Sequence, residues 1–188
     1  MKVWSIQPIN VYENILKHGY YRCDGRKIDK YFRERYNWLC DEMVKRIGKP
    51  PKNVRYPVWA WHTRNWEHKR PDLRNSGYSY AGDKMVCMEL EIPDDKIVLT
   101  DFDAWHFVLN NWYLNVHCIN EEMWDKDHEM LNLMSNEDKE KAIEDSWQGV
   151  FDVEPFENDW MHKGRWIQAT FWEIKKENIK SVKFFTAR

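Results

Sequence analysis

The sequence predicts an α+β fold, a single domain over residues 1–188 with a mostly antiparallel sheet, continuous or split, and covering helices. Apolar and polar residues alternate near both ends of the chain, and helical spacing dominates the middle. No run rich in Pro, Gly or Ser divides the chain, and 188 residues are enough to bury one sizeable core.

The first elements are a strand over residues 2–7 and a helix that follows it. Pro8 suits the first turn of this helix, and Gly19 ends it. A second helix is expected over residues 28–47, because apolar residues recur there every three or four positions until Gly48.

The next strand, residues 57–63, alternates so that Trp59 and His62 point to opposite faces. Residues 64–82 are polar and rich in turn residues, which predicts a long surface loop. The remaining expected elements are strands over residues 85–92, 165–174 and 181–185, an extended run over 97–99, and helices over 100–115, 120–133 and 135–149.

Composition limits the function. Twelve Trp, nine Tyr and eight Phe in a chain of mean hydropathy -0.84 indicate that large rings supply much of the buried area. With 29 basic and 31 acidic residues, no whole-chain field favours nucleic acid or an anionic membrane, although local basic patches stay open. The four cysteines lack metal-ligand spacing and are expected to be reduced thiols.

Residues 99–117 contain the most informative pattern. At 100° per residue, apolar side chains share one face, and Asp103, His106 and Asn110 lie directly beside it. A cleft wall would place ionisable groups in this position. The competing interpretation is a covering helix, capped by Thr100 or Asp101, with His106 as a satisfied half-buried histidine.

Two kinds of chemistry fit this segment. Asp103 stands three positions before His106, so that its carboxylate would orient the imidazole as a base. A metal-dependent hydrolase would instead need several ligands, drawn from His62, Asp101, Asp103 and His106. The sequence contains no local metal signature, phosphate-binding glycine loop or GxSxG motif.

Two further groups are candidates for ligand binding. In Pro71-Asp72-Leu73-Arg74 the proline stiffens a turn, and Arg74 can bind a phosphate or a carboxylate, including that of Asp72 or Asp101. We expect its partner to be an acidic side chain of residues 101–103 or a bound anion. Gln168 shares a strand face with Trp166, a combination that suits a planar ligand such as a nucleobase or nicotinamide. It equally suits a sheet face covered by a helix.

Five motifs spread over the chain carry a family resemblance: Trp4-Ser5-Ile6-Gln7-Pro8, Tyr36-Asn37-Trp38, Pro71-Asp72-Leu73-Arg74, Leu99-Thr100-Asp101-Phe102-Asp103-Ala104-Trp105-His106 with Leu109-Asn110, and Gln168-Ala169-Thr170-Phe171-Trp172. Together they resemble an uncharacterised family of bacterial and phage proteins known only as a domain of unknown function. This resemblance implies no activity.

The opening strand with the helix over residues 11–19, and the late tail over residues 179–184, more distantly resemble ADP-ribosyltransferase-like folds, especially those that modify nucleic acids. Such folds imply NAD binding, a His or Arg on the opening strand and a catalytic Glu on a late strand. Here Ser5 or Gln7 takes the first place, and Gln168 stands near the second. Both departures bear against transferase activity, because glutamine neither accepts a proton nor carries negative charge.

These observations predict a cytoplasmic protein with an aromatic cleft for NAD or another nucleotide, acting on nucleic acid or in phage conflict. The candidate catalytic residues are His106, Asp103 and Gln168, and the candidate cofactor-binding residues are Gln7, Trp59, His62, Arg74, Asn110 and Trp166. The alternatives are a non-enzymatic interaction module with a Trp-rich face, whose partner would be a protein, and a metal-dependent hydrolase. No signal peptide or long apolar run is present, so a membrane partner is not expected.

Overall fold

The structure, a computed structural model, describes residues 1–160 and 162–188. They form two compact units. The first unit comprises Met1–His62, His68–Val98 and Gln168–Arg188, and the second comprises Thr63–Glu67 and Leu99–Ile167. The single domain expected over residues 1–188 remains a prediction.

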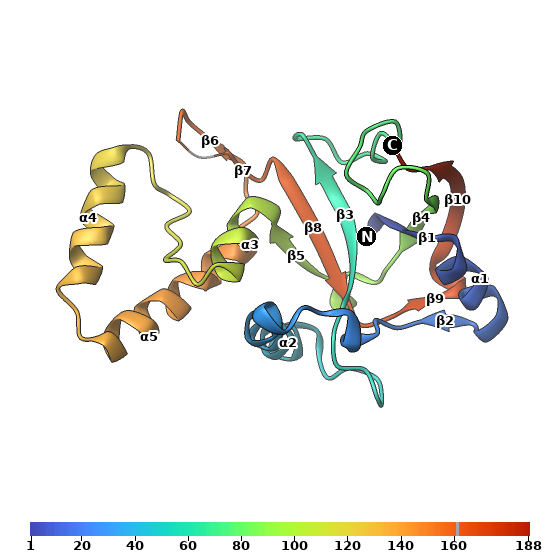
Figure 1. Cartoon of the computed structure of the whole chain (residues 1–188), viewed down its shortest axis with the longest axis horizontal. Helices are drawn as coiled ribbons and strands as arrows, with labels where there is room; N and C mark the ends of the chain where they lie inside the picture. The colour runs from blue at the N-terminus through green and yellow to red at the C-terminus, as the bar shows by residue number, and fades with distance from the viewer. Residues whose placement is uncertain (161) are drawn as a thin grey trace. The chain divides into compact units, whose positions relative to one another are not determined.

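The main sheet has six strands, in the order β10-β4-β1-β3-β8-β5 (Figure 1). Their bounds are β1 Lys2–Pro8, β3 Val58–Arg64, β4 Lys84–Glu91, β5 Val98–Asp101, β8 Trp166–Phe171 and β10 Ile179–Thr186. β1 pairs antiparallel with β3 and β4, and β10 pairs antiparallel with β4. The expected α+β class with a mostly antiparallel sheet is confirmed.

The core of the first unit follows from strand alternation. In the β1–β4 register, Val3 pairs with Leu90 and Ser5 pairs with Met88, and all four side chains are fully buried. Because residues two apart on a strand share a face, these pairs form one continuous buried surface across the two strands.

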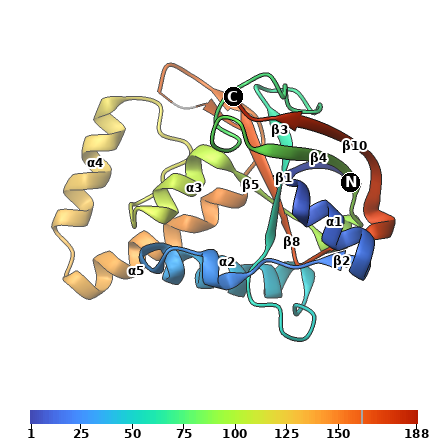
Figure 2. The ribbon, with the colours of Figure 1, turned by 45° about the vertical axis from the view of Figure 1, so that its right-hand side comes forward.

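The helices of the first unit are α1, Ile9–His18, and α2, Arg33–Ile47. α1 ends where sequence predicted, since Gly19 adopts a left-handed conformation and its N–H donates to the Ile15 carbonyl. Figures 1 and 2 show α1 near β4 and β10, and the rings of Tyr12 and Phe184 meet edge to face at 5.7 Å.

The second helix starts later than predicted. Residues 28–47 were expected to be helical, but α2 begins only at Arg33. The Asp29 side chain accepts a hydrogen bond from the Tyr31 N–H and begins a separate 3₁₀ turn, Lys30–Phe32. A local side-chain acceptor therefore competes with the regular helix at this end.

The helices of the second unit are α3, Phe102–Leu109, α4, Glu121–Asn132, and α5, Asn136–Ser146. α5 begins at the predicted cap, because the Ser135 hydroxyl accepts from the Asp138 N–H at 3.1 Å. It ends at Ser146 rather than near Gly149, and a 3₁₀ turn, Trp147–Phe151, follows. None of the helices in residues 1–160 and 162–188 has both the length and the apolar character needed to cross a membrane.

Two small sheets were not predicted. β2, Tyr20–Tyr21, pairs with β9, Ile174–Lys175, and β6, Phe156–Glu157, pairs with β7, His162–Lys163. The strand expected over residues 165–174 is therefore two strands, β8 and β9, separated by a bend at Trp172.

Candidate functional site

Three neighbouring strands of the sheet carry several predicted site residues. β3 lies between β1 and β8. Because Trp4 pairs with Trp61 in register, alternation places Gln7 and His62 on one face and Trp59 on the other. The register agrees with the predicted alternation, and it separates Trp59 from Gln7 and His62, with which Trp59 was expected to line one cleft.

Gln168 lies on β8, the strand beside that of His62. The Arg64 guanidinium lies 5.2 Å from the centre of the Trp166 ring, which brings the end of β3 beside the start of β8. His62 and Gln168 lie on these two adjacent strands. Gln7, His62 and Gln168 are all half-buried.

The amide of Gln7 is held by a short chain of hydrogen bonds. Its Nε2 donates to the Ser5 hydroxyl at 3.1 Å, and this hydroxyl donates to the Trp59 carbonyl at 3.1 Å. Ser5 is fully buried, so these bonds satisfy a polar group inside the unit and fix the Gln7 side chain.

His62 is a neutral group at pH 7. Its imidazole stacks on that of His68, with ring centres 4.0 Å apart. Burial lowers the pKa of His62 to about 4, helped by the charges of His68 and the N-terminal amine. Without charge, the imidazole offers one hydrogen-bond donor and one acceptor.

Arg74 forms an ion pair with Asp72. Its Nη2 and Nε lie 2.7 and 2.9 Å from the two carboxylate oxygens, and its N–H donates to the same carboxylate at 3.0 Å. The Arg74 hydrogen bonds hold the pKa of Asp72 well below its usual value. The predicted contact with residues 101–103 is thus replaced by one within the turn, and both side chains line a groove of about 1020 Å³.

The N-terminal end of α3 is organised by Asp101, which is only 2% exposed. Its Oδ1 accepts from the Ala104 N–H at 2.9 Å, and its Oδ2 accepts from the Gly164 N–H at 2.7 Å. Burial raises the pKa of this carboxyl, and the two hydrogen bonds oppose the rise. Asp101 is one of the two predicted caps.

His106 does not have its predicted environment. α3 buries Ala104, Trp105 and Val108, which leaves the imidazole exposed on the other side. The His106 Nδ1–H donates to the Phe102 carbonyl at 2.9 Å, not to Asp103. The expected orientation of this imidazole by Asp103 is therefore wrong.

Asn110 ends the helix early. It is exposed, and its Nδ2 donates to the His106 carbonyl at 2.8 Å. Asn111 then has a φ of 58°, which breaks the helical path. The helix predicted over residues 100–115 accordingly ends at Leu109.

A pocket of about 350 Å³ lies beside α3 within the second unit. Three aromatic rings form much of its wall: Phe107, Trp124 and Trp160. Asp103 also lines the pocket, whereas His106 does not. Lys163, which also lines the pocket, is 4% exposed and donates to Asp152. This pocket therefore has an aromatic wall and a lysine whose charge is paired with that of Asp152.

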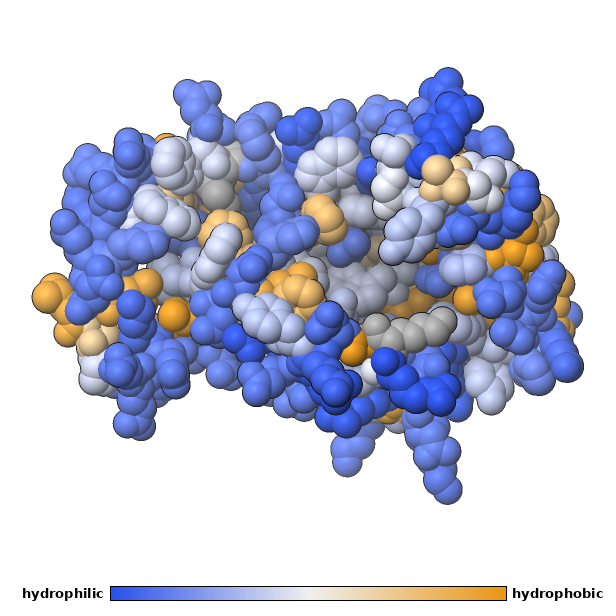
Figure 3. All heavy atoms as spheres, in the orientation of Figure 1, coloured by the Kyte–Doolittle hydropathy of each residue, from blue (hydrophilic) through white to orange (hydrophobic). Residues whose placement is uncertain are grey.

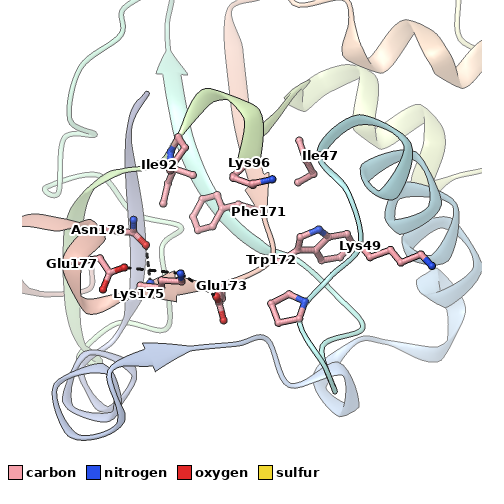
Figure 4. A pocket seen from close by; sticks show the side chains of 12 residues that line it. Ile47, Lys49, Ile92, Lys96, Phe171, Trp172, Glu173, Lys175, Glu177 and Asn178 are labelled. Atoms are coloured by element: carbon pink, nitrogen blue, oxygen red, sulfur yellow. Dashed lines mark hydrogen bonds and ion pairs between the residues drawn. The ribbon is translucent and has the colours of Figure 1, made fainter.

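A second pocket, of about 440 Å³, lies in the first unit (Figure 4). Phe171 and Trp172 form its wall with Ile47 and Ile92, and lysines stand around it (Figure 4). The Trp172 Nε1–H donates to the Gly48 carbonyl at 2.9 Å, which ties the wall to the end of α2. Of the residues that line this pocket, only Phe171 and Trp172 belong to one of the sequence motifs quoted above. The others were not recognised, because they come from segments far apart in the chain.

Metal chemistry has no support in the described part of the chain. Residues 1–160 and 162–188 contain no group of three or more His, Cys, Asp or Glu side chains that could hold a metal ion. Asp101 satisfies backbone donors and His106 faces outward, so the proposed ligands do not converge.

Four of the twelve tryptophans lie in the core: Trp4, Trp105, Trp147 and Trp172. Trp105 and Trp172 are 3% and 7% exposed, whereas Trp112 and Trp160 are 55% and 43% exposed. Figure 3 shows one face of the molecule, on which hydrophilic residues predominate. The two tryptophans that are exposed among the described residues both lie in the second unit, and the alternative of a Trp-rich interaction face rests chiefly on them.

The sequence profile of DUF3841, a domain of unknown function, matches residues 2–180. The chain belongs to this family. The expected membership of an uncharacterised family is thereby confirmed. No curated protein and no solved structure matches the chain, so the comparisons supply no activity.

Three of the motifs quoted for this DUF3841 chain lie at cavities. Asp72 and Arg74 line the groove beside β10, and Asp101 and Asp103 line the pocket beside α3. Phe171 and Trp172 line the pocket of Figure 4. The structure distributes these motifs over separate cavities, each described within one unit.

Proposed function

We propose that this DUF3841 protein is ADP-ribosyltransferase-like and binds NAD or a related nucleotide where β1, β3 and β8 lie side by side. The carrying observation is that the half-buried side chains of Gln7, His62 and Gln168 come from three neighbouring strands, with Gln7 and His62 on one face of β1 and β3. The layout also agrees with the resemblance, since β1 leads into α1 and the late strand β8 precedes the tail strand β10.

The chemistry of these side chains suits a planar, neutral ligand group. The carboxamide of nicotinamide and the edge of a nucleobase each present donors and acceptors together, and so do two amides and a neutral imidazole. Half-burial of Gln7, His62 and Gln168 excludes part of the competing water. Hydrogen bonds formed there therefore contribute to affinity.

These residues support binding of NAD without transfer of its ADP-ribosyl group. A glutamine at position 168 neither takes a proton nor stabilises a developing positive charge. We place the protein in the cytoplasm of a bacterial cell, with a nucleic-acid or protein target as its partner.

Calorimetric titration with NAD tests the proposal. The Gln168→Ala variant should bind NAD about fivefold more weakly, because one hydrogen bond worth about 1 kcal/mol is lost. Gln148→Ala is the matched control, since Gln148 is exposed in the 3₁₀ turn of the second unit. Both variants should keep the melting temperature of the unmodified chain.

Two results would contradict the proposal. One is an unmodified chain that does not bind NAD or a related nucleotide, and the other is equal affinity in the two variants. Gln168→Glu adds a further measurement, because a carboxylate at this position should enable water to hydrolyse NAD to nicotinamide and ADP-ribose if the strand is a transferase strand.

A further inference from the structure

Positive charge is concentrated in the groove beside β10, called here the basic groove. Asp72 is the one carboxylate side chain among its described lining residues. Its cationic side chains are Lys69, Arg70, Arg74, Lys183 and Arg188. The chain as a whole has a net charge of -2, so this concentration is local and is not a property of the composition.

Two segments bring these cations together. The loop over residues 69–74 forms one side of the groove, and the end of β10 forms the other. Lys183 pairs in register with Cys87 of β4. Arg70 of the loop and Lys183 of β10 line the same groove. Burial raises the pKa of the Cys87 thiol to about 11; the charges of Arg70 and Lys183 oppose that rise, and the charge of Glu89 adds to it.

Aromatic residues flank the groove. The Tyr78 ring meets Phe185 of the groove edge to face at 6.0 Å, and the Tyr78 hydroxyl donates to the Asp72 carbonyl at 3.1 Å. Tyr80 is 88% exposed. Gly82 and Asp83, which follow Tyr80 closely, hydrogen-bond through their backbone to Ala187 at the groove. Because the Asp83 N–H also donates to the Tyr80 carbonyl at 3.1 Å, these bonds anchor the backbone of Tyr80 near the Ala187 end of the groove, and its ring is exposed there.

We propose that the basic groove binds single-stranded nucleic acid. Phosphates would pair with Lys69, Arg70 and Lys183, and a base would stack on Tyr80. Arg74 is oriented by Asp72, so its guanidinium contributes a fixed rather than a mobile contact.

The exposed ring distinguishes a single strand from other anions. An acidic peptide uses the cations but has no base to stack, and the bases of a duplex are already stacked on one another. The groove uses none of Gln7, His62 and Gln168. Nucleic-acid binding and NAD binding can therefore fail separately.

Fluorescence anisotropy with a labelled deoxythymidine dodecamer tests the proposal. With three phosphate contacts, the logarithm of the affinity should fall with that of the salt concentration with a slope of about -2. In Arg70→Ala/Lys183→Ala the affinity should fall at least about tenfold and the slope should weaken by about 1.4. The matched control, Arg26→Ala/Lys141→Ala, removes one Arg and one Lys from exposed positions elsewhere and should bind normally.

Variants of Tyr80 form the second part of this binding experiment. Tyr80→Ala should weaken binding at least about fivefold, and Tyr80→Phe should restore it, because stacking needs the ring and not the hydroxyl. Circular dichroism should show that all variants stay folded.

The proposal is overturned if the dodecamer does not bind, or if the groove and control variants bind it equally. It is also overturned if a duplex binds as tightly, if Tyr80→Ala has no effect, or if polyglutamate of equal charge displaces the strand equally well. The last outcome would assign the groove to acidic proteins.

Discussion

Asp101 joins two segments of the second unit with one carboxylate. It accepts from the Ala104 N–H at the start of α3 and from the Gly164 N–H, which precedes β8. The sequence motif limited the cap to Thr100 or Asp101, because capping depends on the next few residues. It was not sufficient to predict the second bond, which joins positions 63 residues apart.

Removal of this carboxylate should be costly. Asp101→Ala leaves two buried N–H groups without their acceptor and should lower the free energy of unfolding by about 3 kcal/mol. Asp101→Asn keeps an acceptor for Ala104 only and should cost about half as much. Urea unfolding measures both, and equal stability of the two variants would contradict this account of the second bond.

The Asp101 carboxyl should also make the stability of the unmodified chain depend on pH. Since burial raises the pKa of Asp101 above its ordinary value of 3.8, the folded chain holds the proton at a pH where the unfolded chain releases it. This carboxyl's contribution to the unfolding free energy thus falls as pH rises from 3.8 through the raised pKa. In Asp101→Asn that component of the pH slope should be absent.

Other residue assignments depended on information beyond the sequence. Arg74 could be expected to have an acidic partner, but Asp72, residues 101–103 and a bound anion all satisfied the same pattern. His106 lay beside the apolar face in a longer helix, and the early end of α3 removed the context for a cleft there. Local chemistry was predictable, whereas the choice among equivalent partners was not.

At the scale of elements, helix ends were predicted best where glycine sets the backbone. α1 and α2 end at Gly19 and Gly48 as expected. The two-residue strands β2 and β9 had no such signal, since they exist only because distant segments meet. Strand periodicity needs several residues to be recognised, and these strands are too short to show it.

Gly48 should tolerate alanine less well than Gly19. Its φ of 83° and ψ of 175° belong to a region essentially restricted to glycine, so Gly48→Ala should cost about 1–3 kcal/mol. Gly19, with φ 85° and ψ -13°, lies close to the left-handed helical region, and Gly19→Ala should cost about 1 kcal/mol.

The comparison isolates the backbone term, because an added Cβ at either glycine meets no atom within 4 Å. Thermal and urea unfolding of the two variants measure the difference. A Gly48→Ala variant as stable as Gly19→Ala would show that the chain near residue 48 relaxes easily.

At the scale of the whole molecule, the strands were recognised but their order was not. β1 pairs with β4, although β3 precedes β4 in the chain, and β8 lies next to β3. Alternation indicates which residues share a face of one strand, but pairing depends on contacts between segments far apart. The proposed His62 and Gln168 site follows from that order.

Burial is distributed unevenly over the chain, and local stability should follow it. β4 buries Met85, Val86, Cys87, Met88 and Leu90, and it is hydrogen-bonded to a strand on each side. By contrast α4 and α5 each bury one side chain, Leu131 and Ile143. Regions with few buried contacts open at a lower free energy than the global unfolding.

Hydrogen–deuterium exchange of the intact chain should therefore show amides of residues 121–146 exchanging about a hundredfold faster than those of β4. α2 is the control for helical structure, because it buries Leu39, Cys40, Met43 and Ile47. Its amides should exchange at rates closer to β4 than to α4 and α5. Similar protection of all three helices would mean that α4 and α5 gain stability from contacts other than their single buried residues, and would refute burial as the determinant of local opening here.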